Sequence, residues 1–404
     1  MHRLLGKRII VGVTGGISAY KSAFLVRLLR KNGADVRIVM TQNATKFVTP
    51  LTFQALSSKP VYTELLDLNT ENAMSHIELA RWADLILIVP ASANFIAKYA
   101  FGFAEDLLST MCLATDCPIA LAPSMNQQMW LNEATQDNIK KIIGRGVYII
   151  GPAMGDQACG EEGPGRMLEP EEIVKYTANI FQTNILTGSR LLVTAGPTRE
   201  AIDPIRFLSN RSSGRMGYAV ATAAVEAGAD VTLISGPVNL QAMGVEKIIH
   251  VTSAAEMHES VMHEISSTDI FISAAAVSDF RAQRISEQKI KKSQDLNELV
   301  LEKTSDILFH VSGLRDAPFT VGFAAETEDL ESNAQEKMFM KNLDMIAANQ
   351  VGERIGFDSD KNALTVFWKT GSEQLPFTSK NKLARRLIRL IALQYNEKNS
   401  DKTH

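Results

Sequence analysis

One local order of residues occurs twice in this 404-residue chain, and the repeat limits the possible folds more than any other feature. Near the N-terminus, the run KRIIVGVT leads into GGIS, then into AYKSAFLVRLLRKNG and the apolar run ADVRIVMT. From residue 190, RLLVTAG is followed by a loop, then by GYAVATAAVEAG and ADVTLISG. Each order predicts a strand, a loop, a helix and a second strand, with Gly33 and Gly228 as left-handed helix caps.

A further strand is predicted in each half, at residues 83–94 and 268–279. Repeated βαβ units of this kind predict an α/β protein with two tandem Rossmann-like domains and mainly parallel sheets. A hydrophobic fraction of 45% and a charged fraction of 22% are those of an ordinary globular protein. We place the first domain at 1–187 and the second at 188–404.

The charge and the cysteines argue against several classes of protein. The net charge is −3 with both signs interspersed, so we expect neither a nucleic-acid nor a membrane partner. Three cysteines without a CxxC pair support neither a disulfide framework nor a zinc site. Residues 1–13 lack the pattern of a secretory signal, and the longest apolar run, at 83–97, is too short to span a bilayer. We therefore expect a cytoplasmic protein that acts on small molecules.

In parallel sheets, ligands bind beyond the carboxyl ends of the strands. Gly15 and Gly16 would let backbone N–H groups approach an anion, and Ser18 adds a hydroxyl at a helix start. A tight turn without a ligand is the alternative. GVTGGIS does not fit GxGxxG, and the next strand ends without an acidic residue for a ribose, which disfavours NAD. The phosphate of FMN fits better, and further polar groups at adjacent strand ends are Thr41, Ser92 and Asn94.

Three other residues of the first half are ambiguous by residue type. His76 follows Ser75, which has capping-box spacing to Glu78, so the histidine is predicted in the first turn of a helix, as a base or as a packing residue. Asn126, in PSMNQQMW, is an amide clamp or a turn residue. Cys159 lies in QACGEEGPGRM, whose composition is typical of an exposed, mobile loop, so its thiol is either incidental or used.

Together, GGIS, SHIEL, PASANFIAKYAFGFAEDLLST, PSMNQQMW and ACGEEGPGRM resemble the FMN-dependent phosphopantothenoylcysteine decarboxylases over residues 1–185. The resemblance implies a flavodoxin-like fold that binds FMN. It also implies that His76 is the base of the oxidative step, that Asn126 holds the substrate carboxylate and that Cys159 delivers a proton from a lid. Ser124 departs from the alanine that is common in the family.

The loops of the second half suggest an anion site. Residues 194–217 bring several arginines and two serines directly before a predicted helix, which favours phosphate binding over a solvated charged loop. SAAAVSDF, at 273–280, would allow a flat ring or a backbone to approach closely, although helix packing explains its alanines equally well. Lys337 and Lys341 are four residues apart and share one helix face. Lys289 lies in QKIKK, and this pattern taken alone predicts a solvated strand edge.

AGPTRE, DPIRFLSNRSSGRMG, AAAVSDF, KIKK, VGFAAET and KNLDMIAAN resemble the phosphopantothenate–cysteine ligases over about 188–395. The resemblance implies that CTP activates 4′-phosphopantothenate as an acyl-cytidylate, which the amine of cysteine attacks. It places Asn210 and Arg206 at the acyl phosphate and Lys289 on the CTP phosphates. The remaining residues implied for CTP are Ser273, Ala274, Ala275, Asp279, Ser305, Asp306, Ile307, Leu308, Phe323, Lys337 and Lys341.

Several points stay open at this level. Thr304 and Ser305 depart from the usual Lys-Asn-Pro-Asp pattern, and although Mg²⁺ is expected to bridge the phosphates, its ligands cannot be read from the sequence. The choice between CTP and ATP also stays open. The order of the halves is that of the bacterial bifunctional enzyme of coenzyme A synthesis, which implies a homo-oligomer with sites at subunit interfaces. The alternatives are a decarboxylase of peptides with a C-terminal cysteine, and a non-catalytic FMN-binding regulatory protein.

Overall fold

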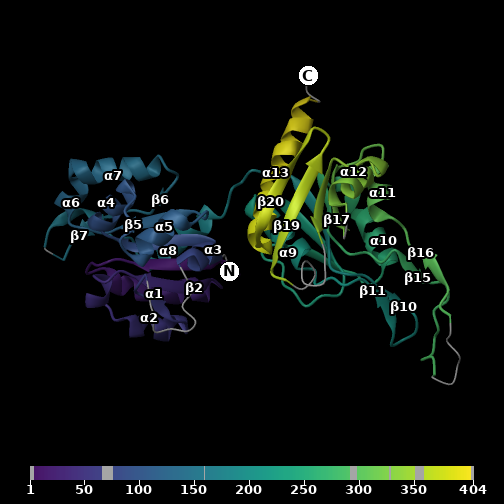
Figure 1. The fold of residues 1–404 in the computed structure, drawn as a ribbon, viewed down its shortest axis with the longest axis horizontal. Coiled ribbons are helices and arrows are strands. Elements are labelled where there is room, and N and C mark those ends of the chain that lie inside the picture. The colour runs from purple at the N-terminus through teal and green to yellow at the C-terminus, as the bar shows by residue number, and fades with distance from the viewer. Residues whose placement is uncertain are drawn as a thin grey trace. The chain divides into compact units, whose positions relative to one another are not determined.

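The computed structural model describes residues 4–65, 76–158, 160–291, 298–326, 329–350 and 359–401. The chain divides into two compact units, Met1–Phe181 and Gln182–His404 (Figure 1). Each unit contains a central sheet with helices around it, and each is described by itself below.

The sheet of the first unit is entirely parallel, with the strand order β3-β2-β1-β4-β5-β6. The order reverses between β1 and β4, and such a reversal opens a crevice at the carboxyl ends of the two strands. Both expectations for this half, parallel strands and α/β class, are confirmed. The strands are β1 (Arg8–Val13), β2 (Asp35–Met40), β3 (Val61–Tyr62), β4 (Leu85–Ala91), β5 (Ile119–Pro123) and β6 (Tyr148–Ile149).

Helices cover both faces of this sheet. One buried cluster joins the sheet to α1, α2 and α8, and a second joins it to α3, α4, α5 and α7. A small antiparallel hairpin, β7–β8, lies outside the main sheet. The elements are α1 (Ala19–Lys31), η1 (Ala44–Lys46), α2 (Pro50–Ser57), α3 (His76–Trp82), α4 (Ala93–Phe101), α5 (Leu107–Ala114), α6 (Gln127–Leu131), α7 (Glu133–Ile143), β7 (Ala153–Asp156), β8 (Glu162–Arg166) and α8 (Pro170–Ile180).

The sheet of the second unit has the order β13-β12-β9-β14-β17-β18-β19-β20. Its first six strands are parallel and repeat the order of the first unit, whereas β19 and β20 are antiparallel additions. The strands are β9 (Arg190–Ala195), β12 (Asp230–Ser235), β13 (Lys247–His250), β14 (Ile270–Ser273), β17 (Phe319–Glu326), β18 (Met345–Gln350), β19 (Lys361–Trp368) and β20 (Gly371–Ser379).

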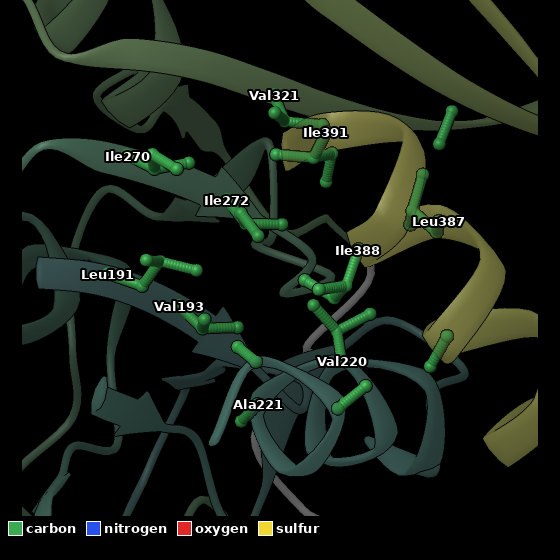
Figure 2. Packing of buried hydrophobic residues seen from close by; sticks show 14 of the residues in the cluster. Leu191, Val193, Val220, Ala221, Ile270, Ile272, Val321, Leu387, Ile388 and Ile391 are labelled. Carbon is green, nitrogen blue, oxygen red and sulfur yellow. The ribbon is translucent and has the colours of Figure 1, made fainter. Parts of the chain in front are cut away.

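The C-terminal helix completes the larger core of this unit. Leu387, Ile388 and Ile391 of α13 point at the sheet and at α9 (Figure 2). Two short ribbons, β10–β11 and β15–β16, project from the body of the unit (Figure 1). The elements are β10 (Arg199–Ala201), β11 (Phe207–Ser209), α9 (Arg215–Glu226), α10 (Ala254–Glu264), η2 (Ile265–Ser267), β15 (Phe280–Ala282), β16 (Leu301–Lys303), α11 (Ile307–Ser312), α12 (Leu330–Met340) and α13 (Lys380–Asp401).

The two predicted glycine caps have the expected conformation. Gly33 has φ +88° after α1, and Gly228 has φ +87° after α9, a region that side chains other than glycine rarely adopt. A Cβ on Gly33 would collide with Leu5, and one on Gly228 would lie 2.6 Å from Thr187 Oγ1. Both glycines therefore end a helix and also admit the chain segment that precedes the first strand of the unit.

No helix in the described residues is both long and apolar enough to cross a membrane.

Candidate active sites of the two units

A cavity of about 1150 Å³ lies at the carboxyl ends of β1, β2, β4 and β5 in the first unit. This is the edge where the order of the sheet reverses, as expected for a ligand site of an α/β sheet. Residues predicted from sequence that line it are Gly15, Gly16, Ser18, Thr41, Ser92, Asn94 and Asn126. The fold therefore brings together side chains that the sequence spreads over more than a hundred positions.

The loop between β1 and α1 supplies backbone donors to this cavity. In the described part of the chain, the N–H groups of Gly15, Gly16 and Ile17 make no hydrogen bond. A Cβ on Gly16 would meet nothing within 4 Å, so space is open beside these donors. Unpaired N–H groups at a helix N-terminus, next to open space, fit a phosphate group.

Two serines at the cavity make local hydrogen bonds. Ser18 Oγ donates to Ser124 Oγ over 2.7 Å, across the end of β4. Ser124 is the residue that departs from the family pattern, and its hydroxyl lines the cavity. Ser92 caps α4 by accepting a hydrogen bond from the N–H of Phe95 at 3.3 Å. Ser92 thus has a structural role besides its place in the cavity wall.

The glycine-rich segment around Cys159 forms the β7–β8 hairpin. The N–H of Met125 donates to Gly165 O over 3.0 Å, which ties the hairpin to the segment that follows β5. A Cβ on Gly163 would collide with Gln127, and one on Gly165, with φ +128°, would collide with Met125 O. These two glycines are buried and allow close packing, whereas the sequence suggested that they give a loop its mobility.

Asn126 stands where the hairpin meets the cavity. Its Oδ1 accepts the N–H of Gln128 at 2.8 Å and caps α6, while its Nδ2 donates to Glu161 Oε2 at 2.6 Å. Gln157 Oε1 accepts a longer hydrogen bond of 3.4 Å from the same amide nitrogen. The Asn126 amide is therefore held in one orientation and is already paired with a carboxylate.

His76 is the first described residue of α3, so its predicted place in a helix is confirmed. It is half-buried, and it is not among the described residues that line the cavity. Ser75 and Cys159 lie outside the described residues. The neighbours of Cys159, Gln157 and Ala158, do line the cavity.

The lysine and arginine side chains that line this cavity are paired with carboxylates. Lys21 Nζ and Arg166 Nη2 both bind Glu169 Oε1, at 2.8 and 2.9 Å, and the hydrogen bond from Lys21 lowers the pKa of Glu169. Lys98 Nζ lies 2.5 Å from Glu105 Oε2, and this hydrogen bond raises the pKa of Lys98. Because of these pairs, the cavity wall is polar without a strong excess of positive charge.

A second cavity, of about 690 Å³, lies at the corresponding edge of the second unit. Its wall includes the start of α9 and the ends of β14, β17 and β18. Residues predicted from sequence that line it are Asn210, Ser273, Ala274, Ala275, Asp279, Ser305, Asp306, Ile307, Leu308, Phe323, Lys337 and Lys341.

Hydrogen bonds and an ion pair hold the loop before α11, residues 304–306, in the wall of this cavity. Asp306 caps α11 by accepting the N–H of Phe309 at 3.0 Å, and its other carboxylate oxygen lies 2.5 Å from Lys341 Nζ. Burial raises the pKa of Asp306, but the hydrogen bonds from Lys341 and the Phe309 N–H, together with the charges of Lys341 and Lys337, outweigh burial and leave the pKa below its ordinary value. Thr304 Oγ1 donates to Ser278 O at 2.6 Å, so this departure from the family pattern holds the loop in place.

Arg206 and Lys289 are not among the described residues that line the second cavity. Arg206 instead pairs with Asp203 at 2.9 Å and donates to Ile290 O at 2.6 Å. Burial raises the pKa of Asp203, but the N–H groups of Ile205, Arg206 and Ile290 and the Arg206 guanidinium together lower it to about 2. The segment that carries Lys289 is thereby fastened beside the β10–β11 ribbon.

Sequence reasoning missed several residues of both cavities. In the first, Gln157 and Glu161 orient Asn126, and their hydrogen bonds exist only because the hairpin folds back onto residues 125–127. In the second, Asn349, Asn362 and Lys380 line the wall. The sequence signal for Asn362 is weak but present, since it holds a position in a strand whose alternate residues, Leu364 and Val366, are buried.

Within the described ranges, no three histidine, cysteine or acidic side chains converge in a way that could hold a metal ion.

Comparison with known proteins gives matches over nearly the whole chain. Residues 2–182 match the family described as Flavoprotein, and residues 186–394 match the DNA/pantothenate metabolism flavoprotein C-terminal domain. The chain is 54% identical to the Coenzyme A biosynthesis bifunctional protein CoaBC of Vibrio cholerae. The alignment spans 396 residues and covers 97% of this chain and 99% of that protein. It is 48% identical to the protein of the same name from Escherichia coli K12, over 98% of this chain and 99% of that one.

A crystal structure of the C-terminal domain of a coenzyme A biosynthesis bifunctional protein CoaBC is also similar. It is 38% identical and covers 53% of this chain and 99% of its own, with a TM-score of 0.46.

Proposed function

From the premise that this chain belongs to the family of coenzyme A biosynthesis bifunctional proteins CoaBC, we propose a division of two reactions between its units. Residues 188–404 are the phosphopantothenate–cysteine ligase, and residues 1–187 are the decarboxylase of the ligase's product. The carrying observation is that the residues implied for FMN, and those implied for CTP apart from Lys289, line two separate cavities, each at the carboxyl edge of its own sheet.

FMN is the cofactor of the first unit in this proposal. The unpaired N–H groups of Gly15, Gly16 and Ile17, with Ser18, would hold its phosphate, and Thr41 and Asn94 would contact the rest of the molecule. When bound, FMN supplies reversible two-electron oxidation of the substrate thiol, which gives the decarboxylation an electron sink. The open space at Gly16 and the cavity volume of about 1150 Å³ support this fit.

Asn126 is the proposed clamp for the substrate carboxylate. Its amide nitrogen already donates to the Glu161 carboxylate over 2.6 Å, so the geometry needed for a substrate carboxylate is present. A substrate that enters the cavity would replace Glu161 as the acceptor. Because Oδ1 caps α6, the amide cannot turn its oxygen toward a carboxylate without losing that hydrogen bond.

We propose that His76 is the base of the oxidative step and reaches the cavity from a second copy of the chain. Two observations support this: His76 does not line the cavity of its own unit within the described residues, and the apolar Phe24 of α1 and Leu51 of α2 are exposed. An oligomer would cover these side chains and could bring His76 to a neighbouring cavity.

Cys159 is the proposed proton donor. Gln157 and Ala158 line the cavity, which supports a place for the thiol near the substrate. Cys159→Ser should still release carbon dioxide, but the unsaturated thiol product should accumulate because its reprotonation is blocked. Normal formation of phosphopantetheine by this variant, measured by mass spectrometry, would rule out the role.

The second unit is proposed to bind CTP between the β14 and β17 ends, the Asp306 loop and the lysines of α12. Mg²⁺ is expected to bind with the nucleotide, where it would neutralise charge on the phosphates. Asn210 is proposed at the acyl phosphate. Arg206 and Lys289 lie together outside this cavity, so we propose that they serve the cavity of a second copy.

The test supplies 4′-phosphopantothenate, cysteine, CTP and Mg²⁺ to the FMN-loaded protein and measures pyrophosphate and carbon dioxide. Both should form, and neither should form when CTP is left out. Synthetic phosphopantothenoylcysteine should give carbon dioxide without CTP. A protein that releases neither product from the complete mixture would refute the proposal.

A further inference from the structure

One end of the second cavity holds polar residues that the family resemblance does not assign. β18 and β20 run parallel and end at this edge, whereas the antiparallel β19 begins there. Asn349 near the end of β18, Asn362 near the start of β19 and Lys380 at the start of α13 are therefore brought together, and all three line the cavity. The implied CTP residues come from other strands and helices of the wall.

Asn362 is an amide in an apolar row. It shares a strand face with Leu364 and Val366, which belong to the core beneath α9 and α13, the core seen in Figure 2. Its exposed fraction is 5%, yet its side chain makes no hydrogen bond to any described residue. Among the described residues, its amide atoms are not fully enclosed, so they open onto the cavity that Asn362 lines. A leucine would suit this apolar row better, so the amide indicates a polar group bound in the cavity.

Lys380 supplies positive charge to the same end of the cavity, although its exposed fraction is only 6%. The helix that it begins is already capped, because the N–H of Lys380 donates to Asp360 O at 2.9 Å and that of Lys382 donates to Ser379 Oγ at 3.4 Å. The binding capacity of this end thus comes from side chains rather than from the helix terminus. Arg215 of α9, also in the wall, is tied to the same segment through Asp360, at 2.7 Å.

The donors define the ligand. An amide, an ammonium and a guanidinium offer N–H groups, and Asp360, the carboxylate paired with the guanidinium, is not among the described residues that line the cavity. Such a set suits the oxygens of a phosphoryl group. We propose that Asn362 and Lys380 form a phosphoryl subsite of the ligase cavity and fix one phosphorylated substrate. This inference rests on the proposed function, in which both CTP and 4′-phosphopantothenate carry such groups.

The test uses the full-length protein with Asn362→Leu and Lys380→Met. Asn381→Leu is the matched control, because Asn381 is an exposed amide at the start of α13 that does not line the cavity. Asn362→Leu should raise the KM of one phosphorylated substrate about 10-fold, as expected for loss of a hydrogen bond to a charged group. Its thermal midpoint should stay the same or rise, and Asn381→Leu should leave both KM values unchanged.

Two arms identify the phosphoryl group. A raised KM for CTP, with weaker CTP binding by calorimetry, assigns the subsite to the nucleotide. A raised KM for 4′-phosphopantothenate, with no change for pantothenate that lacks the phosphate, assigns it to the acyl substrate. Unchanged KM values for both substrates with a raised thermal midpoint would overturn the inference and leave water as the amide's partner.

If the leucine variant fails to fold, Asn362→Asp replaces it in the test, because aspartate has almost the same shape as asparagine. A carboxylate there repels a phosphoryl group, so the same KM should rise, and an unchanged KM would equally overturn the subsite. Wild-type protein that makes no pyrophosphate would refute the ligase function itself. An active wild type with unaffected variants refutes only the subsite.

Discussion

In the first unit α1 begins at Ala19, shortly after β1 ends at Val13, whereas in the second unit residues 196–214 separate β9 from α9. The six parallel strands have the same order in both units, so the sheet places a cavity at the same edge. The short first connection leaves unpaired N–H groups beside open space at Gly16. The long second connection forms the β10–β11 ribbon, which carries Arg206 away from the cavity of its own unit.

The cavities are also closed by different elements. A hairpin, β7–β8, packs onto residues 125–127 and orients Asn126 in the first unit. In the second unit, the antiparallel strands β19 and β20 and the helix α13 extend the wall. The shared strand order thus fixes where a cavity forms, while the inserted and appended elements decide which side chains line it.

The sharpest way to test the separation of the units is His76→Asn. If His76 is the base, loss of a positioned proton acceptor should lower carbon dioxide release from phosphopantothenoylcysteine by about 100-fold or more. Pyrophosphate release by the ligase should not change, because its cavity belongs to the other unit. An equal loss of both activities would instead indicate misfolding, and retained flavin absorbance is the control.

Two glycine variants should distinguish a glycine that leaves room for a ligand from a glycine that lets a helix pack closely on a strand. A Cβ on Gly217 would lie 2.5 Å from the Ala195 Cβ, so Gly217→Ala should push α9 from β9 and destabilise the second unit by about 1–3 kcal/mol. Gly16→Ala meets no protein atom and should leave the stability unchanged while weakening FMN binding. Urea unfolding and flavin titration measure the two effects. Equal stability losses would contradict the distinction.

Ser124→Ala should have a smaller effect, confined to the first unit. The substitution removes the acceptor of the 2.7 Å hydrogen bond from Ser18, so the Ser18 hydroxyl becomes free to rotate. We expect FMN to bind about 3- to 10-fold more weakly, the range for loss of one neutral hydrogen bond. Quenching of flavin fluorescence on binding measures this, and CTP affinity serves as the internal control. Tighter FMN binding would show that the pair competes with the cofactor.

The smallest expected effect is a pH dependence between about pH 5 and 7 in the stability of the second unit. His258 Nε2 and His310 Nδ1 lie 2.8 Å apart, between α10 and α11. Burial and the neighbouring His310 hold the pKa of His258 below the ordinary 6.5. The unfolded chain therefore takes up this proton more readily, so the free energy of unfolding should fall as the pH drops below about 6.5. His258→Gln should reduce that fall in urea unfolding, and an identical pH dependence in the variant would exclude the pair as its source.

Local sequence patterns predicted a large part of both sites. Glycine loops, small residues and polar side chains at strand ends line the two cavities because parallel strands carry their carboxyl ends to one edge. The caps at Gly33 and Gly228 were predictable for a local reason, namely that only a few residues tolerate their conformation.

Other features depended on contacts between distant segments. QACGEEGPGRM suggested a mobile loop, whereas Gly163 and Gly165 are buried against residues that lie about forty positions earlier in the chain. Arg206 was expected at a phosphate, and its partners are Asp203 and the carbonyl of Ile290. The residue type shows that a side chain can bind an anion, but it does not show which partner the side chain contacts in the folded protein.

Short-range periodicity and backbone preferences were enough to predict the two α/β units, the strands that form their sheets and the residue types at each strand end. Contacts between distant segments set the rest: Asn126 donates to Glu161, Arg206 lies outside the cavity of its own unit, and the Asn362 amide lines the second cavity without a hydrogen-bond partner among the described residues. Those outcomes depend on which long-range hydrogen bonds and buried surfaces form together, and local patterns do not carry that information.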